Sequence, residues 1–381
     1  MLQIKFFFRQ MAKLLIQNII LPVVYFFASS KDADGSLVVF ADAHHDGLPD
    51  SMTDLYTYLK EREENTGGSV HITTFFRDFG KLSSGEQLKT SIRFMKLYAK
   101  AGCVVLCDNF LPVSACKKRK ETKVVQLWHG PGAYKKFGYD TKDDIPSFYK
   151  SNVFANYDLV TVSGQRAVAP FTSAMRQEAG VVRPIGVSRM DRWFDEAALL
   201  KDRELFVQMY PEAAGKKVLL WVPTFRGNAG VPSLDGLDSV KKLGEVLGDE
   251  WFVIISLHPH LLTYADYAAY KQKMTSSQIL PSADLVVTDY SSILYDAVIL
   301  KKKLLIFAPD MDSFFAKRGS YMKPEEIPAM IVQRDEELKS AVLETDASYD
   351  ADAAAAFYES WLAACDGKAT ERIAEYILSR N

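Results

Sequence analysis

Short apolar runs alternate along the chain with longer segments in which every third or fourth residue is apolar. The run at residues 36–41 is followed by such a segment at 51–64, and the alternation continues to about residue 162. Uninterrupted apolar runs are typical of parallel strands covered on both faces, and the periodic segments are typical of the covering helices. The pattern predicts a doubly wound α/β sheet, with strands at residues 36–41, 70–75, 103–107, 124–128 and 159–162.

A second α/β series follows the first. Its strands are predicted near residues 220, 254, 286 and 305, and two helices at 353–364 and 369–378 come after the last of them. We therefore divide the chain into a short first segment at 1–30, an N-terminal α/β domain at 31–195 and a C-terminal α/β domain at 196–381. Two doubly wound parallel-sheet domains whose strand ends face a shared cleft are the plan of a GT-B-like fold.

The first segment is basic and apolar, with no acidic residue before Asp32. Its apolar run at 14–28 is shorter than the roughly 20 residues that a membrane-spanning helix needs, and polar residues and a proline interrupt it. Basic helices of this kind lie on anionic membrane surfaces. We predict that residues 1–30 form an amphipathic membrane-association segment, touching the membrane through residues 1–29; the alternative is a helix packed on the protein's own surface.

Composition narrows the functional class. The chain has 381 residues, of which 48% are hydrophobic and 25% charged, with a formal net charge of -2. Without an overall positive field, a nucleic-acid partner is not expected. The four cysteines form no Cys-x-x-Cys pair, which argues against a zinc site and fits a reducing cytoplasm.

Polar residues gather where predicted strands end. The strand near 286 ends at Thr288 and Asp289, and Ser291 and Ser292 then precede a helical segment. The free N–H groups of a helix start can hold phosphate. The alternative is an ordinary helix-capping serine.

Three other strands end in the same way, with groups that can bind phosphate or move protons. Ligands of open α/β sheets bind at the carboxyl ends of strands, so four such ends point to a substrate site. The residues at the other three ends are His129 and Gly130, Thr224 and Arg226, and His258 and His260.

These strand ends resemble the CDP-glycerol:poly(glycerophosphate) glycerophosphotransferases, which build wall teichoic acid and related polymers. The resemblance covers roughly residues 100–380, and its motifs are Leu127-Trp-His-Gly130, Pro223-Thr-Phe-Arg226, Leu257-His-Pro-His260, Thr288-Asp-Tyr-Ser-Ser292, Gly186-x-x-Arg189-x-Asp191 and Asp366-Gly-Lys-Ala-Thr-Glu-Arg372. The chain departs from the family pattern at Pro131 and Gly132, where Thr-Pro is usual, and at Ser188 and Met190, where Pro and Asn are usual. In the family, the loop of the first departure borders the acceptor side.

The resemblance implies a GT-B fold and a peripheral enzyme on the cytoplasmic face of the cell membrane. Glycerol phosphate would pass from CDP-glycerol to a hydroxyl of a polyprenyl-diphosphate-linked saccharide or a growing polymer, with release of CMP, as in a primase. The N-terminal domain would lie on the acceptor side and the C-terminal domain would bind the donor. Alternatives are a CDP-ribitol-dependent transferase, a nucleotide-sugar glycosyltransferase, and a non-catalytic nucleotide-binding module.

Roles for individual residues follow from the chemistry of phosphoryl transfer to an alcohol. We predict His129 as the general base, and His258 as the group that binds the diphosphate or protonates the leaving phosphate. Arg226 offers a planar fork to phosphate oxygens. The predicted substrate-binding residues are Gly130, Thr224, Arg226, His260, Thr288, Asp289, Ser291, Ser292 and Asp296. Asp289 would orient His258 or the glycerol, and Asp296 would reach a ribose or be a solvated helix residue.

No Asp-x-Asp pair stands at a strand end. Histidine, arginine and a helix dipole can supply the positive charge that the phosphates need. We therefore expect no tightly bound metal or cofactor, with loosely associated Mg²⁺ as the open alternative.

Overall fold

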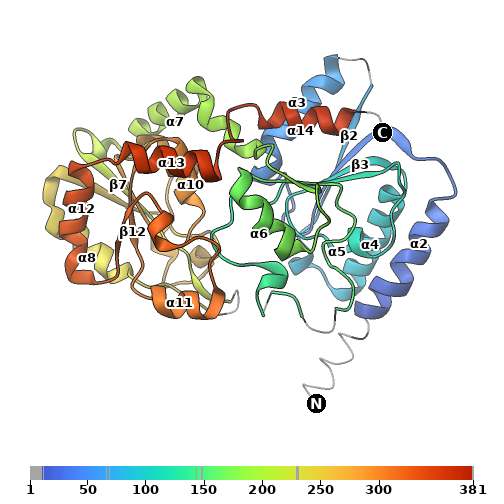
Figure 1. Ribbon diagram of the computed structural model, residues 1–381, viewed down its shortest axis with the longest axis horizontal. Helices are drawn as coiled ribbons and strands as arrows, with labels where there is room; N and C mark the ends of the chain where they lie inside the picture. Colours follow the sequence, from blue (N-terminus) through green and yellow to red (C-terminus); the bar gives the residue numbers. More distant parts are fainter. Residues whose placement is uncertain are drawn as a thin grey trace. The chain divides into compact units, whose positions relative to one another are not determined.

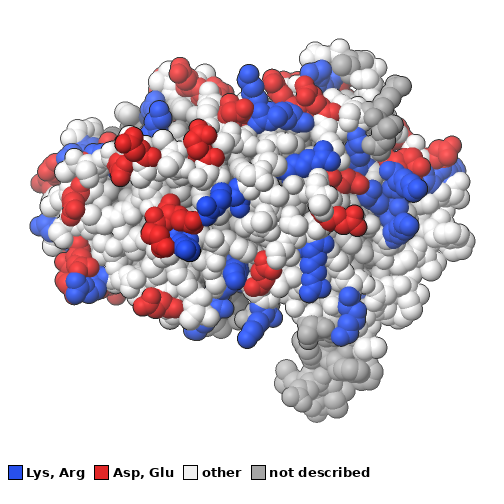
Figure 2. Space-filling model, in the orientation of Figure 1, with Lys and Arg blue, Asp and Glu red and all other residues white. Residues whose placement is uncertain are grey.

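The computed structural model describes residues 11, 13–65, 67, 69–142, 144–146, 149–228 and 231–379. The chain divides into two compact units, each built on one parallel sheet (Figure 1). Unit 1 comprises residues 1–131, 137–191 and 364–381, and unit 2 comprises residues 132–136 and 192–363. In the view of Figure 2, acidic and basic side chains are interspersed, as the small net charge leads one to expect.

The sheet of unit 1 has the strand order β2-β1-β3-β4-β5-β6, and all of its neighbouring strands are parallel. The strands are β1 (Asp34–Asp42), β2 (His71–Phe76), β3 (Ala101–Leu106), β4 (Lys123–Gln126), β5 (Leu159–Thr161) and β6 (Val182–Arg183). The helices are α2 (Leu21–Ala28), α3 (Asp50–Asn65), α4 (Ser84–Tyr98), α5 (Leu111–Ser114), α6 (Gln165–Met175) and α14 (Ala369–Leu378).

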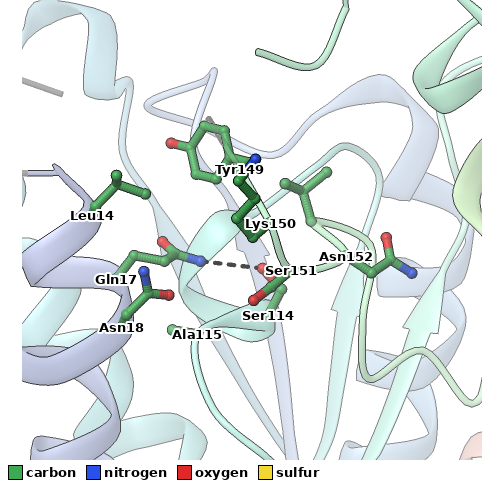
Figure 3. Close-up of a pocket in the computed structure, with 10 residues that line it drawn as sticks. Leu14, Gln17, Asn18, Ser114, Ala115, Tyr149, Lys150, Ser151 and Asn152 are labelled. Carbon is green, nitrogen blue, oxygen red and sulfur yellow. Dashed lines mark hydrogen bonds between the residues drawn. The ribbon is translucent and has the colours of Figure 1, made fainter. Parts of the chain in front are cut away.

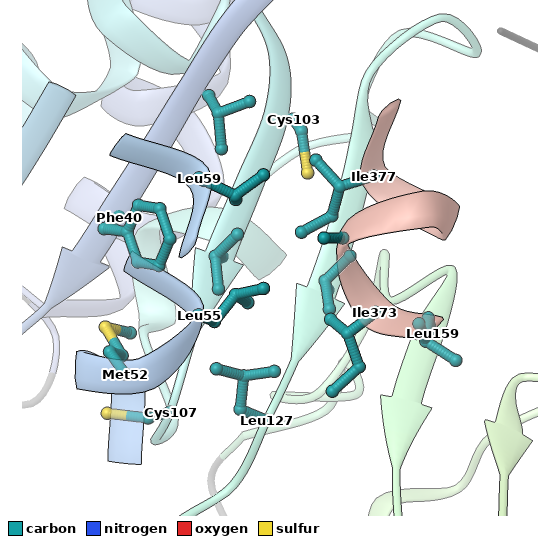
Figure 4. Packing of buried hydrophobic residues seen from close by; sticks show 14 of the residues in the cluster. Phe40, Met52, Leu55, Leu59, Cys103, Cys107, Leu127, Leu159, Ile373 and Ile377 are labelled. Atoms are coloured by element: carbon teal, nitrogen blue, oxygen red, sulfur yellow. The ribbon is translucent and has the colours of Figure 1, made fainter. Parts of the chain in front are cut away.

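One face of this sheet is covered by α3 and α14. Their apolar side chains form a single buried cluster with the strands, as Figure 4 shows for Leu55 of α3, Phe40 of β1 and Ile373 of α14. On the other side, α2 packs on α4, with the rings of Tyr25 and Tyr98 centred 5.1 Å apart. Helices on both faces explain the uninterrupted apolar strands, and the prediction of a parallel α/β sheet is confirmed.

Unit 2 repeats the plan with the order β10-β7-β11-β12-β13, again parallel throughout. Its strands are β7 (Lys217–Val222), β10 (Trp251–Ile255), β11 (Leu285–Thr288), β12 (Lys303–Phe307) and β13 (Met330–Val332), with a separate hairpin of β8 (Arg226–Asn228) and β9 (Val231–Ser233). The helices are α7 (Glu196–Met209), α8 (Leu237–Leu247), α9 (Ser276–Ile279), α10 (Ile293–Ile299), α11 (Met311–Arg318), α12 (Leu338–Ala347) and α13 (Ala351–Trp361). Side chains of α8 and α12 join the main core cluster of this sheet.

The units differ from the predicted domains in two places. The main boundary lies between Asp191 and Arg192, close to the prediction, but the chain returns to unit 1 at Ala364. Helix α14 was assigned to the C-terminal domain; it belongs to unit 1 because Ile373 and Ile377 are buried in the core of that unit. Residues 132–136 were assigned to the N-terminal domain and belong to unit 2.

The N-terminal segment is helical over residues 13–28, with a π-helical turn (Ile16–Ile20) directly before α2. Leu21 and Tyr25 are buried against unit 1, and the Gln17 side chain donates to the Leu111 carbonyl at 3.0 Å. One side of the helix therefore packs on unit 1, and association of the segment with a membrane stays a prediction. A small pocket of about 150 Å³ lies beside it, between Gln17 and the loop at 149–153 (Figure 3).

The opposite side of this helix is apolar and exposed. We call it the apolar stripe, and it consists of Met11, Leu15, Ile19, Val23, Phe26 and Phe27, which are 48–74% exposed. Among the described residues, no helix has both the length and the hydropathy needed to cross a membrane. Lys5 and Arg9, two basic residues of the predicted membrane-association segment, lie outside the described residues.

Candidate functional site

Two adjacent strands of unit 2 are joined at their carboxyl ends by Asp289. Val222 at the end of β7 pairs with Thr288 at the end of β11, so the residues that follow them lie side by side. The Thr224 N–H donates to both Asp289 carboxylate oxygens, at 2.9 and 3.0 Å. Asp289 is 2% exposed. Burial raises its pKa, and Arg226 acts against that rise. Asp289 is thus a positioning residue; in the described part of the chain its partners are Thr224, Arg226 and the Tyr290 N–H, and His258 is not among them.

Arg226 is held between two carboxylates. Its Nε and Nη2 donate to Asp310 at 2.7 and 2.8 Å, and its Nη1 donates to Asp289 at 3.0 Å. The guanidinium also lies over the ring of Tyr290, 4.9 Å from its centre, and the Tyr290 hydroxyl donates to Asp310 at 3.0 Å. Burial acts to lower the pKa of Arg226, but the carboxylates of Asp310 and Asp289 raise it above its usual value. The Arg226 guanidinium, which was predicted to bind phosphate, is therefore charged and already paired with carboxylates.

The predicted site residues at and after the end of β11 differ in burial and in hydrogen bonding. The Thr288 hydroxyl donates to the Val222 carbonyl at 2.6 Å and so joins the two strands. Ser291 and Ser292 are half-buried before α10, and the Ser292 side chain makes no capping hydrogen bond. Asp296 is 4% exposed and accepts the Trp193 indole N–H at 2.7 Å, which makes it a buried structural residue. The solvated role predicted for Asp296 does not fit that position, and the ribose role stays a prediction.

His258 and His260 follow β10, which neighbours β7. The His260 backbone N–H donates to His258 Nδ1 at 3.2 Å. Nδ1 therefore carries no proton, and a neutral His258 presents an Nε2–H donor. Loss of surrounding water lowers the pKa of His258, and the nearby charges of His260 and Lys135 lower it further. A neutral donor suits phosphate binding better than it suits proton release. The ring of Phe225 packs against both imidazoles.

In unit 1, His129 follows β4 on a strained backbone. Trp128 has a φ of 57°, a left-handed conformation that costs a large side chain free energy. Its indole packs among Phe137, Phe154 and Phe171. The same indole stacks on the His129 ring, with the two ring centroids 4.4 Å apart. The strained turn presents His129 to solvent, with its side chain 55% exposed.

A carboxylate that the sequence analysis missed stands beside this histidine. Asp108 follows β3, the strand next to β4, and its Oδ2 lies 3.5 Å from His129 Nδ1. The same oxygen lies 3.9 Å from His44 Nε2, beyond the end of β1. Asp108 could have been selected from the sequence, because it directly follows a buried strand, as the other candidate residues do. Gly130, next to His129, has open space where a side chain would be.

Two motifs far apart in sequence meet within unit 1. Asp191 accepts the backbone N–H groups of Ala369 and Thr370 at 3.1 and 2.7 Å, and so caps the start of α14. Arg372 donates to the carbonyl of Ile185 at 2.9 Å. The Ser188 hydroxyl lies 2.8 Å from that of Thr370, so this departure from the family pattern makes a buried contact. These motifs hold α14 in place.

Gly132, the other notable departure, also has a structural reason. A methyl group at this position would overlap the ring of Tyr295, a fully buried residue of α10. Within the described part of the chain, no group of three or more His, Cys, Asp or Glu side chains is placed to hold a metal ion. The absence of a tightly bound metal stays a prediction.

The sequence profile of the family described as CDP-Glycerol:Poly(glycerophosphate) glycerophosphotransferase matches residues 23–379. The chain is 31% identical, over 90% of both proteins, to a teichoic acid ribitol-phosphate primase of Bacillus spizizenii. It is 28% identical to a teichoic acid glycerol-phosphate primase of Bacillus subtilis, over 72% of this chain and 73% of that protein.

The fold is shared with solved structures. A variant of the wall teichoic acid polymerase TagF, soaked with CDPG, superimposes with a TM-score of 0.72 at 20% identity, over 94% of this chain and 92% of that chain. Residues 127–130, 223–226, 257–260 and 288–292, which the sequence analysis singled out, all lie inside the matched range.

Proposed function

The chain belongs to the CDP-glycerol:poly(glycerophosphate) glycerophosphotransferase family, and from that premise we propose that it transfers an alditol phosphate from a CDP-alditol to a lipid-linked acceptor. An acceptor hydroxyl attacks the phosphorus that carries the alditol. The new P–O bond forms as the bond to the CMP oxygen breaks, and CMP leaves. The acceptor's proton passes to the protein.

His129 and Asp108 are the observation that carries this proposal. The carboxylate of Asp108 lies 3.5 Å from His129 Nδ1, which leaves Nε2 free to accept the proton of an acceptor hydroxyl. Such contacts are often long before substrate binds. His129 is then the catalytic base, and Asp108 is the positioning residue that fixes the ring and stabilises the imidazolium.

The donor's phosphates are assigned to unit 2. His258 offers the Nε2–H donor described above. Arg226 supplies positive charge next to the strand ends, and Asp289 and Asp310 hold it in place. Thr224, Ser291, Ser292 and His260 remain candidates for contacts to the same ligand. The assignment is supported by the position of these groups at the carboxyl ends of β7, β10 and β11.

The family description favours CDP-glycerol as the donor. CDP-ribitol is the second candidate, because the relative that is 31% identical over 90% of both chains is a ribitol-phosphate primase. Both relatives described above are primases, which supports the transfer of one or a few units to a polyprenyl-diphosphate-linked saccharide.

We assign the enzyme to the cytoplasmic face of the membrane. The apolar stripe of the N-terminal helix is exposed along its length, and an amphipathic helix of this kind can bury such a face in the headgroup region. Membrane attachment would hold the enzyme near its lipid-linked acceptor and raise the acceptor's effective concentration.

The test is CMP release by purified protein supplied with CDP-glycerol or CDP-ribitol and a synthetic lipid-linked disaccharide. His129→Ala should abolish release while leaving donor binding intact. His71→Ala is the matched control, because His71 is similarly exposed, at 57%, and pairs with Glu63 on unit 1. Near-normal turnover by His129→Ala would refute the base assignment. Sugar transfer from a nucleotide sugar, or nucleotide binding without turnover of either donor, would refute the proposed reaction.

A further inference from the structure

A segment that follows the His129 strand belongs to unit 2. Lys135 pairs with Ser320 as an isolated antiparallel bridge. On either side of it, the Tyr321 N–H donates to the Tyr134 carbonyl at 2.9 Å, and the Lys136 N–H donates to the Gly319 carbonyl at 3.1 Å. Arg318 Nε donates to the Lys136 carbonyl at 2.8 Å. The backbone of Lys135 is therefore fixed to unit 2 from both sides.

Side chains fix the same segment beside the strand ends. Tyr134 is 3% exposed, and its ring lies 6.3 Å from that of Tyr290, which directly follows Asp289. Gly132 lies against Tyr295, as described above. These contacts position Lys135 close to the residues that follow β11.

The surroundings of the Lys135 ammonium are charged. Asp289, Arg226 and Arg318 all act on it electrostatically, and its own charge acts on His258. Burial lowers the pKa of Lys135 to about 8, and the opposite charge of Asp289 limits that fall. Lys135 thus lies within electrostatic range of the residues assigned to the donor's phosphates.

Lys135 and Arg226 differ in how closely their charges are paired. Four of the five N–H groups of Arg226 are taken by Asp310, Asp289 and the Thr224 carbonyl. Among the residues that the structure describes, no carboxylate oxygen lies within 4.0 Å of the Lys135 ammonium. Lys135 is half-buried, and an ammonium that has lost much of its hydration without a carboxylate partner carries a free-energy cost, as groups of binding sites often do.

We propose that Lys135 binds the diphosphate of the CDP-linked donor, contacting a phosphate oxygen with its ammonium and stabilising the negative charge that grows on CMP as it leaves. The inference rests on the proposed function. It adds a residue that the sequence analysis did not select. It also gives the unit 2 site an unpaired cation, which the doubly paired Arg226 does not provide.

The test measures binding of CDP and of cytidine to the full chain by calorimetry. Lys135→Met should weaken CDP binding about 10- to 100-fold, which is the loss of a charged hydrogen bond, and leave cytidine binding unchanged. Lys135→Arg should recover part of the CDP affinity. Lys136→Met is the control, an adjacent lysine whose stem packs on Gly319, and should bind CDP normally.

Equal CDP binding by Lys135→Met and the unaltered protein would overturn the assignment, and so would an equal loss of cytidine binding, which would indicate a structural role. An unaltered protein that binds no CDP would instead refute the proposed function, and the assignment with it.

Stability and pH supply a second readout. Because burial lowers the pKa of Lys135 to about 8, the charged side chain opposes folding at neutral pH, so Lys135→Met should raise the unfolding temperature. That penalty is relieved as the pH rises above about 8, so the gap between the two proteins should narrow there. CDP affinity should fall over the same pH range in the unaltered protein and hold in Lys135→Arg. A lower unfolding temperature for Lys135→Met would contradict the proposal.

Discussion

The guanidinium of Arg226 and the carboxylate of Asp310 face each other through two parallel hydrogen bonds of 2.7 and 2.8 Å. The two residues are 84 positions apart, and their pairing ties the loop after β7 to the start of α11. Both side chains are largely buried, at 12% and 19% exposure. This geometry allows little rotation of the guanidinium, so Arg226 holds one orientation towards the strand ends.

Asp310→Asn should destabilise the protein by about 1–3 kcal/mol, because a largely buried guanidinium loses the carboxylate that holds it through two hydrogen bonds and keeps only Asp289 at 3.0 Å and Asp235 at 3.7 Å. The measurement is the free energy of unfolding by denaturant at pH 7. Asp312→Asn is the control, since Asp312 is exposed in the same helix and its loss should change little.

The same ion pair predicts a pH dependence. Burial acts to raise the pKa of Asp310, but its bonds to Arg226 lower it below the usual value. A carboxyl with a lowered folded-state pKa stabilises the protein above its unfolded pKa of about 3.9, and that stability is lost as the pH falls through the folded value. The difference in stability between the unaltered protein and Asp310→Asn should shrink below about pH 4. A constant difference down to pH 2 would mean that Asp310 does not titrate as expected.

Asp108→Asn should slow CMP release about tenfold or more while CDP binding stays unchanged, because the His129 ring loses the group that orients it. Single-turnover rates would separate this effect from product release. Asp46→Asn is a suitable comparison, since that carboxylate also lies in unit 1 but pairs with Lys81. Equal rates for Asp108→Asn and the unaltered enzyme would exclude a positioning role.

Gly132→Ala should destabilise unit 2 by about 1–3 kcal/mol, because the added methyl group would overlap the ring of Tyr295 and force a shift in a packed core. Gly130→Ala offers a direct comparison, since the space around that residue is open, and its unfolding midpoint should stay within error of the original. If both variants unfold at the same midpoint, the contact with Tyr295 is not what requires glycine.

The apolar stripe predicts membrane binding. Phe26→Ser combined with Phe27→Ser removes two side chains that are 74% and 70% exposed, so co-sedimentation with anionic lipid vesicles should fall about tenfold or more. Leu200→Ser combined with Val207→Ser removes exposed apolar residues of α7 and should leave sedimentation unchanged. Equal loss in both double variants would mean that the stripe is not a specific membrane face.

The parallel sheets were predictable because doubly covered strands are apolar throughout, as at Val104 and Val286. The strand-end rule placed His129 and Arg226 correctly at the ends of their strands. It could not show that Asp310 would pair with Arg226, because a contact across 84 residues leaves no local pattern. Helix α14 was assigned to the wrong domain for the same reason, since an amphipathic helix does not reveal which core its apolar face will join.

The two departures from the family pattern also could not be explained from the sequence. Ser188 and Gly132 differ from the usual family residues in or beside functional motifs. Their neighbours, Thr370 and Tyr295, explain them through packing and hydrogen bonding. These contacts join residues far apart in the sequence, so no local pattern could have predicted them.

The return of α14 to unit 1 has a consequence for how the protein forms on the ribosome. Unit 1 lacks Ile373 and Ile377 of its core, and the helix that Asp191 caps, until the ribosome has passed residues 192–363 and synthesised α14. Residues 192–363 emerge earlier and are continuous apart from the short segment at 132–136. Domains generally fold as units as they emerge, so the second unit should reach its native state first, and the nascent first unit should expose an apolar sheet face that chaperones can bind until α14 has emerged.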